Sequence, residues 1–238
     1  MGRAFEVRKA AMAKTSLAKA KVYSRFGKEV YMAAKAGVPD PEMNTTLKRT
    51  IEKAKANQVP ADVIKRAIEK AKGGSGEQYT AIMYEGFGNG SATILIDCLS
   101  DNTNRSIADV RACFNKAHAK MGVSGAVSHS YEKVGLLSFD YTDEEAMLDA
   151  LIMADCDVKE MEVEDDIMTL YVEPTDLYKA KDAVETLLPG CEFSVLEISY
   201  IPNEYTRLEG EDKELFERLL NLLDEVDDVQ NVYHNVII

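Results

Sequence analysis

The chain has 238 residues and a net charge of −13, and 46% of its residues are hydrophobic. This length allows one large domain or two to three small ones, and the apolar content is high enough for packed cores, which excludes a disordered tail. No stretch approaches the ~20 apolar residues of a membrane span, and the first residues lack the apolar segment of a signal peptide. We therefore expect a folded cytoplasmic protein with no membrane partner.

The charge is distributed unevenly along the chain. Residues 1–76 hold Lys or Arg at 17 positions and Asp or Glu at seven, a net charge of +10, so residues 77–238 carry −23. Charge asymmetry of this kind favours nucleic acid, or another acidic surface, as a partner of the basic part. The alternative is that the charges only keep both parts soluble.

The basic part begins with residues that are rich in alanine and poor in large apolar side chains, so we expect residues 2–15 to form a mobile leader. Apolar residues spaced three or four apart predict a helix from Ser16 to about Ala36. Asn44 is the predicted N-cap of a second helix, which ends near Ala56. A third helix begins near Pro60 and ends at a flexible glycine-rich linker, residues 73–76.

The outer faces of these predicted helices are basic, with Lys and Arg at spacings of three, four or seven residues. Such residues often do no more than solvate a small helix, and the interspersed glutamates fit that alternative. The uncompensated positive charge favours contacts with nucleic-acid phosphates, which give affinity without reading sequence. The candidate phosphate-binding residues are Arg3, Arg8, Lys9, Lys14, Lys48, Arg49, Lys53, Lys65, Arg66 and Lys70.

Beyond the linker the apolar period changes to two, which predicts strands at 78–85 and 91–99, followed by a helix over about 105–120. The intervening string GFGNG, residues 86–90, resembles a dinucleotide-binding loop. That chemistry requires a helix after the loop so that the phosphate meets the helix N-terminus. Because a strand follows here, we predict a hairpin turn.

The next segment predicts strand 135–141, helix 143–154, strands 158–163 and 167–172, helix 175–188 and strand 192–200. This order, β-α-β-β-α-β, is ferredoxin-like. The last helix, 212–223, and strand, 229–236, are too few to fold alone. The predicted fold class is therefore multidomain α+β: a basic helical domain (1–76), a discontinuous α+β domain (77–131 plus 203–238) and an inserted ferredoxin-like domain (132–202).

No motif for catalysis, a metal or a cofactor stands out. The cysteines and histidines have no zinc-ligand spacing, so we expect buried thiols in a reducing compartment. The acidic clusters at 143–145, 162–166 and 224–228 have the character of solvated surface. No GxSxG, HExxH or Walker sequence occurs. The cysteines and histidines that could serve as metal ligands or catalytic groups are Cys98, Cys113, Cys156, Cys191, His118, His129 and His234.

Several motifs, taken together, resemble the YebC/PmpR family, which includes the mitochondrial translational activator of cytochrome c oxidase. They are YEGFG (84–88), CLSDNTNR (98–105), GAV (125–127) and DDVQNVYHN (227–235), together with PDPEMN (39–44) and AKANQVP (54–60). The resemblance implies a basic helical bundle followed by two α+β domains. It also implies a cytoplasmic DNA-binding transcriptional regulator, although other members are described as ribosome-associated. Many members begin with a Gly-His-Ser-Lys-Trp-like tag, whereas this chain begins GRAFE (2–6) and has no Trp.

The leading hypothesis is a non-enzymatic, DNA-binding transcriptional regulator. The alternative is a factor that associates with the ribosome or rRNA and assists translation elongation. A hypothesis of another class is an interaction scaffold, in which the basic module meets an acidic protein or the chain's own acidic domains. In either case the acidic domains are candidates for holding a protein partner. An enzyme with an unrecognised carboxylate site is the remaining alternative.

Overall fold

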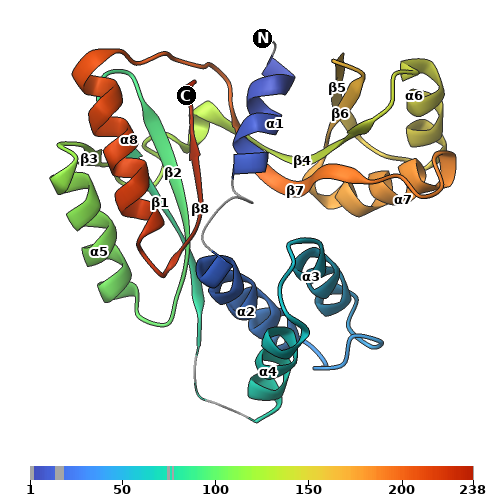
Figure 1. The fold of residues 1–238 in the computed structure, drawn as a ribbon, viewed down its shortest axis with the longest axis horizontal. Helices are drawn as coiled ribbons and strands as arrows, with labels where there is room; N and C mark the ends of the chain where they lie inside the picture. Colours follow the sequence, from blue (N-terminus) through green and yellow to red (C-terminus); the bar gives the residue numbers. More distant parts are fainter. Residues whose placement is uncertain (1–2, 14–18, 74–75, 77, 238) are drawn as a thin grey trace. The chain divides into compact units, whose positions relative to one another are not determined.

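The protein is described here by a computed structural model that covers residues 3–13, 19–73, 76 and 78–237. It confirms the α+β fold class, with helices and two four-stranded sheets (Figure 1). The chain divides into two compact units: residues 1–14, 127–207 and 233–238 form the first, and residues 15–126 and 208–232 the second. The boundaries of three separate domains stay a prediction. No helix among the described residues is long and apolar enough to cross a membrane.

The first unit has the predicted ferredoxin-like order. Its elements are β4 (Tyr131–Asp140), α6 (Glu144–Met153), β5 (Val158–Glu164), β6 (Ile167–Val172), α7 (Leu177–Leu187) and β7 (Phe193–Pro202). The strands lie in the order β5-β6-β4-β7, and each neighbouring pair is antiparallel. Helices α6 and α7 contribute Met147, Leu151 and Val184 to the core on one sheet face, with Leu137 and its cross-strand partner Leu170 beneath them.

Helix α1 (Arg3–Ala13) belongs to this unit and packs on its sheet. Val7 joins a buried cluster with Leu136 and Tyr171, and the backbone N–H of Phe5 donates to Glu164 Oε2 at 3.1 Å. The prediction of a mobile leader is therefore wrong for residues 3–13. Small side chains bury little apolar surface in an isolated helix, but they become buried when the helix packs against a sheet. The remaining leader residues and the predicted cap Ser16 lie outside the described residues.

In the second unit, three helices form a small bundle: α2 (Lys19–Lys35), α3 (Thr45–Ala56) and α4 (Ala61–Lys72). The predicted cap Asn44 is confirmed, because its Oδ1 accepts from the N–H of Leu47 at 2.9 Å. Its Nδ2 donates to the carbonyl oxygens of Ala33 and Val38, so one side chain both starts α3 and fixes it to the end of α2. The bundle core contains Phe26, Val30, Leu47, Ala54 and Ile64.

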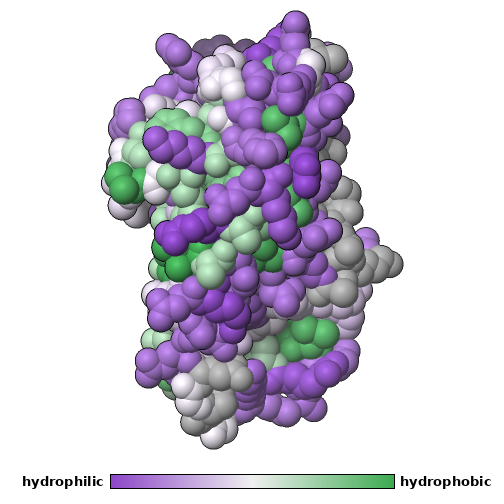
Figure 2. Space-filling view, turned by 90° about the vertical axis from the view of Figure 1, so that its left-hand side faces the viewer, coloured by the Kyte–Doolittle hydropathy of each residue, from purple (hydrophilic) through white to green (hydrophobic). Residues whose placement is uncertain are grey.

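The rest of the second unit is an α+β body. It comprises β1 (Thr80–Phe87), β2 (Thr93–Ser100), α5 (Thr103–Lys116), β3 (Lys120–Met121), α8 (Gly210–Asp224) and residues 229–232 of β8 (Val229–His234), with strand order β3-β1-β2-β8. The short strand β3 was not predicted, because two residues carry no readable alternation. Figure 2 views the molecule from the side on which α5 and α8 lie in Figure 1. The surface seen there is largely hydrophilic, with small hydrophobic patches.

The glycines of the GFGNG string have a packing role. A Cβ atom on Gly86 would lie 2.4 Å from the ring of Phe114 in α5, and one on Gly88 would lie 2.7 Å from Phe216 in α8. Glycine therefore lets both helices approach β1 closely. The string lies in a β1–β2 hairpin, as predicted, and not before a helix that could receive a phosphate.

Candidate nucleic-acid interface

The basic face predicted on the bundle is present on α3 and α4. Residues 45–72 hold eight Lys or Arg and three Asp or Glu, a net charge of +5. Lys48 on α3 and Lys65, Arg66 and Lys70 on α4 are exposed to solvent. Arg66 forms an ion pair with Asp62 at 2.6 Å, and both partners are more than two-thirds exposed. Such an exposed pair contributes little to stability, so it leaves Arg66 able to contact a phosphate.

Two further predicted residues on α3, Arg49 and Lys53, are half-buried. The ammonium of Lys53 lies 5.9 Å from the centre of the Phe26 ring, and that of Lys70 lies 5.8 Å from the ring of Tyr31. The stems of these lysines thus cover apolar parts of the bundle while their charges remain near its surface. Lys53 and Lys70 also lie in the last turns of their helices, where a cation favours the helix dipole.

The predicted residues near the N-terminus do not join this face. Arg8 is only 5% exposed, and its Nη1 lies 3.4 Å from Thr169 Oγ1 beneath α1. That Arg8 contacts phosphate stays a prediction, and the burial of its guanidinium inside the first unit argues against it. Lys9 is exposed on α1. The side chain of Arg3 and the whole of Lys14 lie outside the part of the chain that is described.

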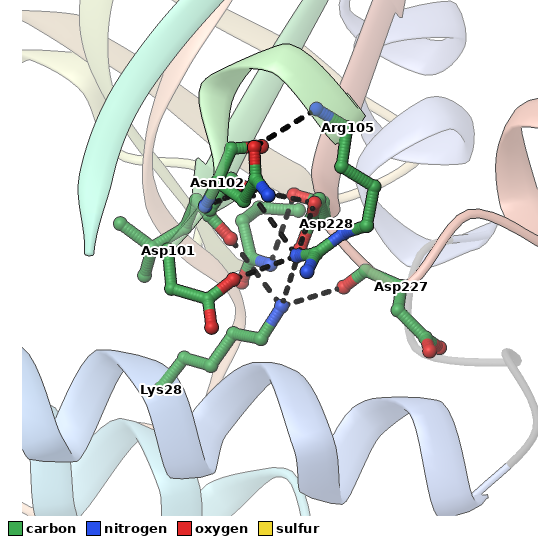
Figure 3. Close-up of polar contacts among 9 residues, drawn as sticks. Lys28, Asp101, Asn102, Arg105, Asp227 and Asp228 are labelled. Carbon is green, nitrogen blue, oxygen red and sulfur yellow. Dashed lines mark hydrogen bonds and ion pairs between the residues drawn. The ribbon is translucent and has the colours of Figure 1, made fainter. Parts of the chain in front are cut away.

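A polar cluster in the second unit was not predicted at all (Figure 3). Its centre is Asp228, just before β8, which is 3% exposed. Lys28 Nζ on α2 lies 3.1 Å from Asp228 Oδ1, Arg105 Nη2 on α5 lies 3.0 Å from Oδ2, and Ser100 Oγ donates to Oδ2 at 2.7 Å. Arg105 also binds Asp101 Oδ1 at 2.7 Å. We call these five residues the Asp228 cluster.

The cluster is one of the attachments between α2 and the α+β body among the described residues. Lys28 also donates to the carbonyl oxygens of Leu99 and Asp227, at 3.3 and 2.9 Å. Arg25 Nη1 donates to the carbonyl of Gln230 at 3.2 Å, and Lys21 binds the carbonyl and side chain of Asp224. Lys21, Arg25 and Lys28 are spaced four and three residues apart, so they share one face of α2. That face is basic in sequence, yet all three residues bind groups within the chain.

The electrostatics of the cluster explain why a carboxylate is stable there. Burial by itself raises the pKa of Asp228, but hydrogen bonds from Ser100, Arg105 and Lys28 outweigh this effect, so the pKa lies below its ordinary value. The pKa of Arg105 is raised, first by its hydrogen bond to Asp101 and then by that to Asp228. The charged forms of Asp228 and Arg105 are therefore favoured, and the cluster acts as an ionic joint between α2 and the α+β body.

The thiols offer no reactive group at this site. Burial raises the pKa of Cys98 to about 12, and it also raises the pKa values of Cys113, Cys156 and Cys191. Thiols with raised pKa values are poor nucleophiles. Cys98 and Cys113 are buried as predicted, whereas Cys156 and Cys191 are half-buried. Among the described residues, no group of His, Cys, Asp and Glu side chains is arranged to hold a metal ion.

Comparison with known families accounts for nearly the whole chain. Residues 3–74 match the family described as "TACO1/YebC protein N-terminal domain", and residues 79–236 match "TACO1/YebC second and third domain". The chain belongs to the TACO1/YebC family. Two of the motifs that suggested this membership, residues 98–105 and 227–235, supply most of the Asp228 cluster.

Relatives within the TACO1/YebC family are similar over their full lengths. A protein of Vibrio campbellii is 51% identical over 99% of both chains, and one of Alteromonas mediterranea is 49% identical over 100% of this chain and 99% of its own. Each is named "probable transcriptional regulatory protein". A crystal structure of a conserved hypothetical protein from Aquifex aeolicus is 31% identical, with a TM-score of 0.77, and covers 94% of this chain and 93% of its own.

Proposed function

We propose that the protein is a non-enzymatic cytoplasmic regulator of gene expression that binds DNA through the exposed cations of α3 and α4. The observation that carries this proposal is the net charge of +5 on these two helices, whose lysines and arginines point to solvent at Lys48, Lys65, Arg66 and Lys70. Arg49 and Lys53 extend the same set. The names of the relatives, probable transcriptional regulatory proteins, favour DNA over RNA as the nucleic acid.

The contrast between α2 and the other two helices supports this assignment. Lys21, Arg25 and Lys28 bind groups of the chain's own body, so they cannot also neutralise phosphates without giving up those bonds. On α3 and α4, by contrast, Lys48, Lys65 and Arg66 are exposed to solvent. Phosphate contacts position a protein on a duplex without reading bases, so we expect weak sequence preference and strong dependence on salt.

The test is a charge reversal on the proposed face. A variant with Lys48→Glu, Arg49→Glu, Lys65→Glu and Arg66→Glu should lose measurable binding to duplex DNA in a fluorescence anisotropy titration. The matched control reverses four exposed cations on the α+β body, by Arg111→Glu, Lys116→Glu, Lys213→Glu and Arg218→Glu. Both variants have the same total charge, so only the location of the change differs. Equal affinities of the two folded variants for DNA would overturn the proposal.

The same titrations with duplex RNA, together with crosslinking and sequencing of nucleic acid bound in cells, separate the two candidate targets. Recovery of promoter DNA supports the regulator that we propose. Recovery of rRNA, with the α3 and α4 variant defective in binding it, would instead establish the alternative, a ribosome-associated factor. Cations that contact phosphates can bind the backbone of DNA or of RNA, so the basic face of the bundle does not favour that alternative.

A further inference from the structure

The outer face of α6 in the ferredoxin-like unit carries large apolar side chains in contact with water. Leu148 is 41% exposed, Ile152 63% and Met153 89%. On the inner face of the same helix Met147 and Leu151 are fully buried in the core. The outer apolar residues are therefore not needed to hold α6 on its sheet, and Figure 1 shows α6 at one end of that unit.

The polar residues on this outer face are all acidic. Residues four apart on a helix are neighbours, so the face has two rows. Glu144, Leu148 and Ile152 form one row, and Glu145, Asp149 and Met153 form the other. Two carboxylates, Glu144 and Glu145, lie in the first turn, Leu148 and Asp149 lie side by side at the middle, and the last two residues of the rows are apolar. Helix α6 contains no Lys or Arg to balance them.

The neighbouring helix does not neutralise these carboxylates either. Helix α7 packs beside α6 and carries two lysines. Lys179 pairs with Asp176 at 3.1 Å, and Lys181 pairs with Glu185 at 2.6 Å. Both lysines are thus engaged by carboxylates of their own neighbourhood. The outer face of α6 remains an apolar patch with an acidic margin.

We propose that this face of α6 is a docking surface for a basic amphipathic helix of a partner protein. The apolar side of such a helix would cover Leu148, Ile152 and Met153, and its lysines or arginines would face Glu145 and Asp149. Amphipathic helices recognise apolar surfaces in this way, and a flexible methionine adapts to the shape of the incoming side chains. The acidic margin supplies charge complementarity, which selects basic partners and speeds association.

The same features argue against other occupants. In a symmetric dimer, two α6 helices packed antiparallel would place Glu144 and Glu145 of each copy against Ile152 and Met153 of the other, where the carboxylates would be desolvated without partners. Nucleic acid would be repelled, because its phosphates would meet Glu144, Glu145 and Asp149. A basic amphipathic helix is the occupant that can cover the apolar side chains of the face and also pair with its carboxylates.

The probe for this proposal is a synthetic helical peptide of about five turns made of leucine and lysine, with all leucines on one face. Its binding to the full-length protein is measured by isothermal titration calorimetry at physiological salt. A second peptide of identical composition has its leucines scattered around the helix. We expect the amphipathic peptide to bind at least about tenfold more tightly than the scattered one, because only it can cover the patch.

The variant Leu148→Gln, Ile152→Gln and Met153→Gln removes the apolar patch with residues that favour helix, and it should lower the affinity for the amphipathic peptide about tenfold. Val123→Gln, at an apolar residue 79% exposed in the other unit, is the matched control and should leave the affinity unchanged. Glu145→Gln with Asp149→Asn should weaken binding and reduce its dependence on salt.

Equal affinity of the α6 variant and the native protein for the amphipathic peptide would overturn the proposal, since the peptide would then bind elsewhere on the acidic surface. Concentration-dependent dimerisation that the α6 variant abolishes would also overturn it, in favour of a second copy as occupant. DNA affinity of the same variant, measured in parallel, should match that of the native protein. Failure of the proposed DNA-binding function is thus distinguishable from failure of this inference.

Discussion

Helix α2 and the pair α3–α4 belong to one small bundle and are all basic, yet their cations have opposite roles. On α2, Lys28 is largely buried and binds Asp228 and two carbonyl oxygens. On α3, Lys48 is exposed to solvent. The difference shows that a local charge count combines cations that hold a fold together with cations that are available to a ligand. Only the location of their acceptors separates the two groups.

Among the changes that test this contrast, removal of the Asp228 carboxylate should have the largest effect on the free energy of unfolding. Asp228→Asn leaves the buried ammonium of Lys28 without its charged partner, and breaking one side of a buried ion pair costs about 3 kcal/mol of the free energy of unfolding. Urea denaturation measures this loss. The adjacent Asp227→Asn alters an exposed side chain and should change stability by less than about 0.5 kcal/mol. Similar stabilities of the two variants would show that the Asp228 cluster does not join α2 to the body.

A pair of single substitutions sharpens the contrast between the helices. Lys28→Gln should lower the free energy of unfolding by about 2 kcal/mol, because it removes hydrogen bonds to a buried carboxylate and two carbonyls. It should leave DNA affinity nearly unchanged. Lys48→Gln should do the reverse: stability stays within about 0.5 kcal/mol, and the slope of log affinity against log salt falls by about one. If Lys28→Gln reduced DNA affinity as much as Lys48→Gln, the assignment of separate roles would be wrong.

Protonation of Asp228 in acid should lower the free energy of unfolding less than the substitution Asp228→Asn does. Since the folded pKa of Asp228 lies below its unfolded value, its ionisation stabilises the protein above the unfolded pKa, near pH 4, and this stabilisation is lost as pH falls through the folded pKa. Arg105, whose pKa is raised, stays charged in this range. Stability measured between about pH 6 and pH 3 should fall less steeply in Asp228→Asn than in the native protein. Parallel curves for the two proteins would contradict this account.

The smallest effect is expected at the exposed ion pair on α4. The hydrogen bond from Arg66 lowers the pKa of Asp62, but both side chains are open to water. Arg66→Gln should therefore change the free energy of unfolding by no more than about 0.5 kcal/mol, while it weakens DNA binding like any lost phosphate contact. A large loss of stability in thermal unfolding would place Arg66 with the structural cations of α2.

The sequence was informative wherever local chemistry decides structure. Asn44 was recognised as a helix cap because its side chain bonds to a backbone group three residues away. The β-α-β-β-α-β order was readable because each element has its own apolar period. The exposure of Lys48, Lys65, Arg66 and Lys70 was readable for the same reason, since exposed positions on a helix follow from its buried ones.

The features that were missed depend on residues far apart in the chain. The carboxylate of Asp228 lies in an acidic run that looked solvated, and its partner Lys28 is 200 residues away. Helix α1 looked mobile because its small side chains bury little until the sheet of the first unit is present. Arg8 was placed on the surface for the same reason. Neither periodicity nor charge counting reports on such long-range pairs.

The position of Asp228 near the end of the chain has a consequence for folding during synthesis. Helix α2 leaves the ribosome early, but the groups that Lys21, Arg25 and Lys28 bind are made about ten seconds or more later at ~5–20 residues per second. The bundle can form its own core first, whereas its attachment to the body must wait for β8. A nascent chain stopped before Asp224 should therefore be cleaved by protease between bundle and body, and extension through Gln230 should protect it.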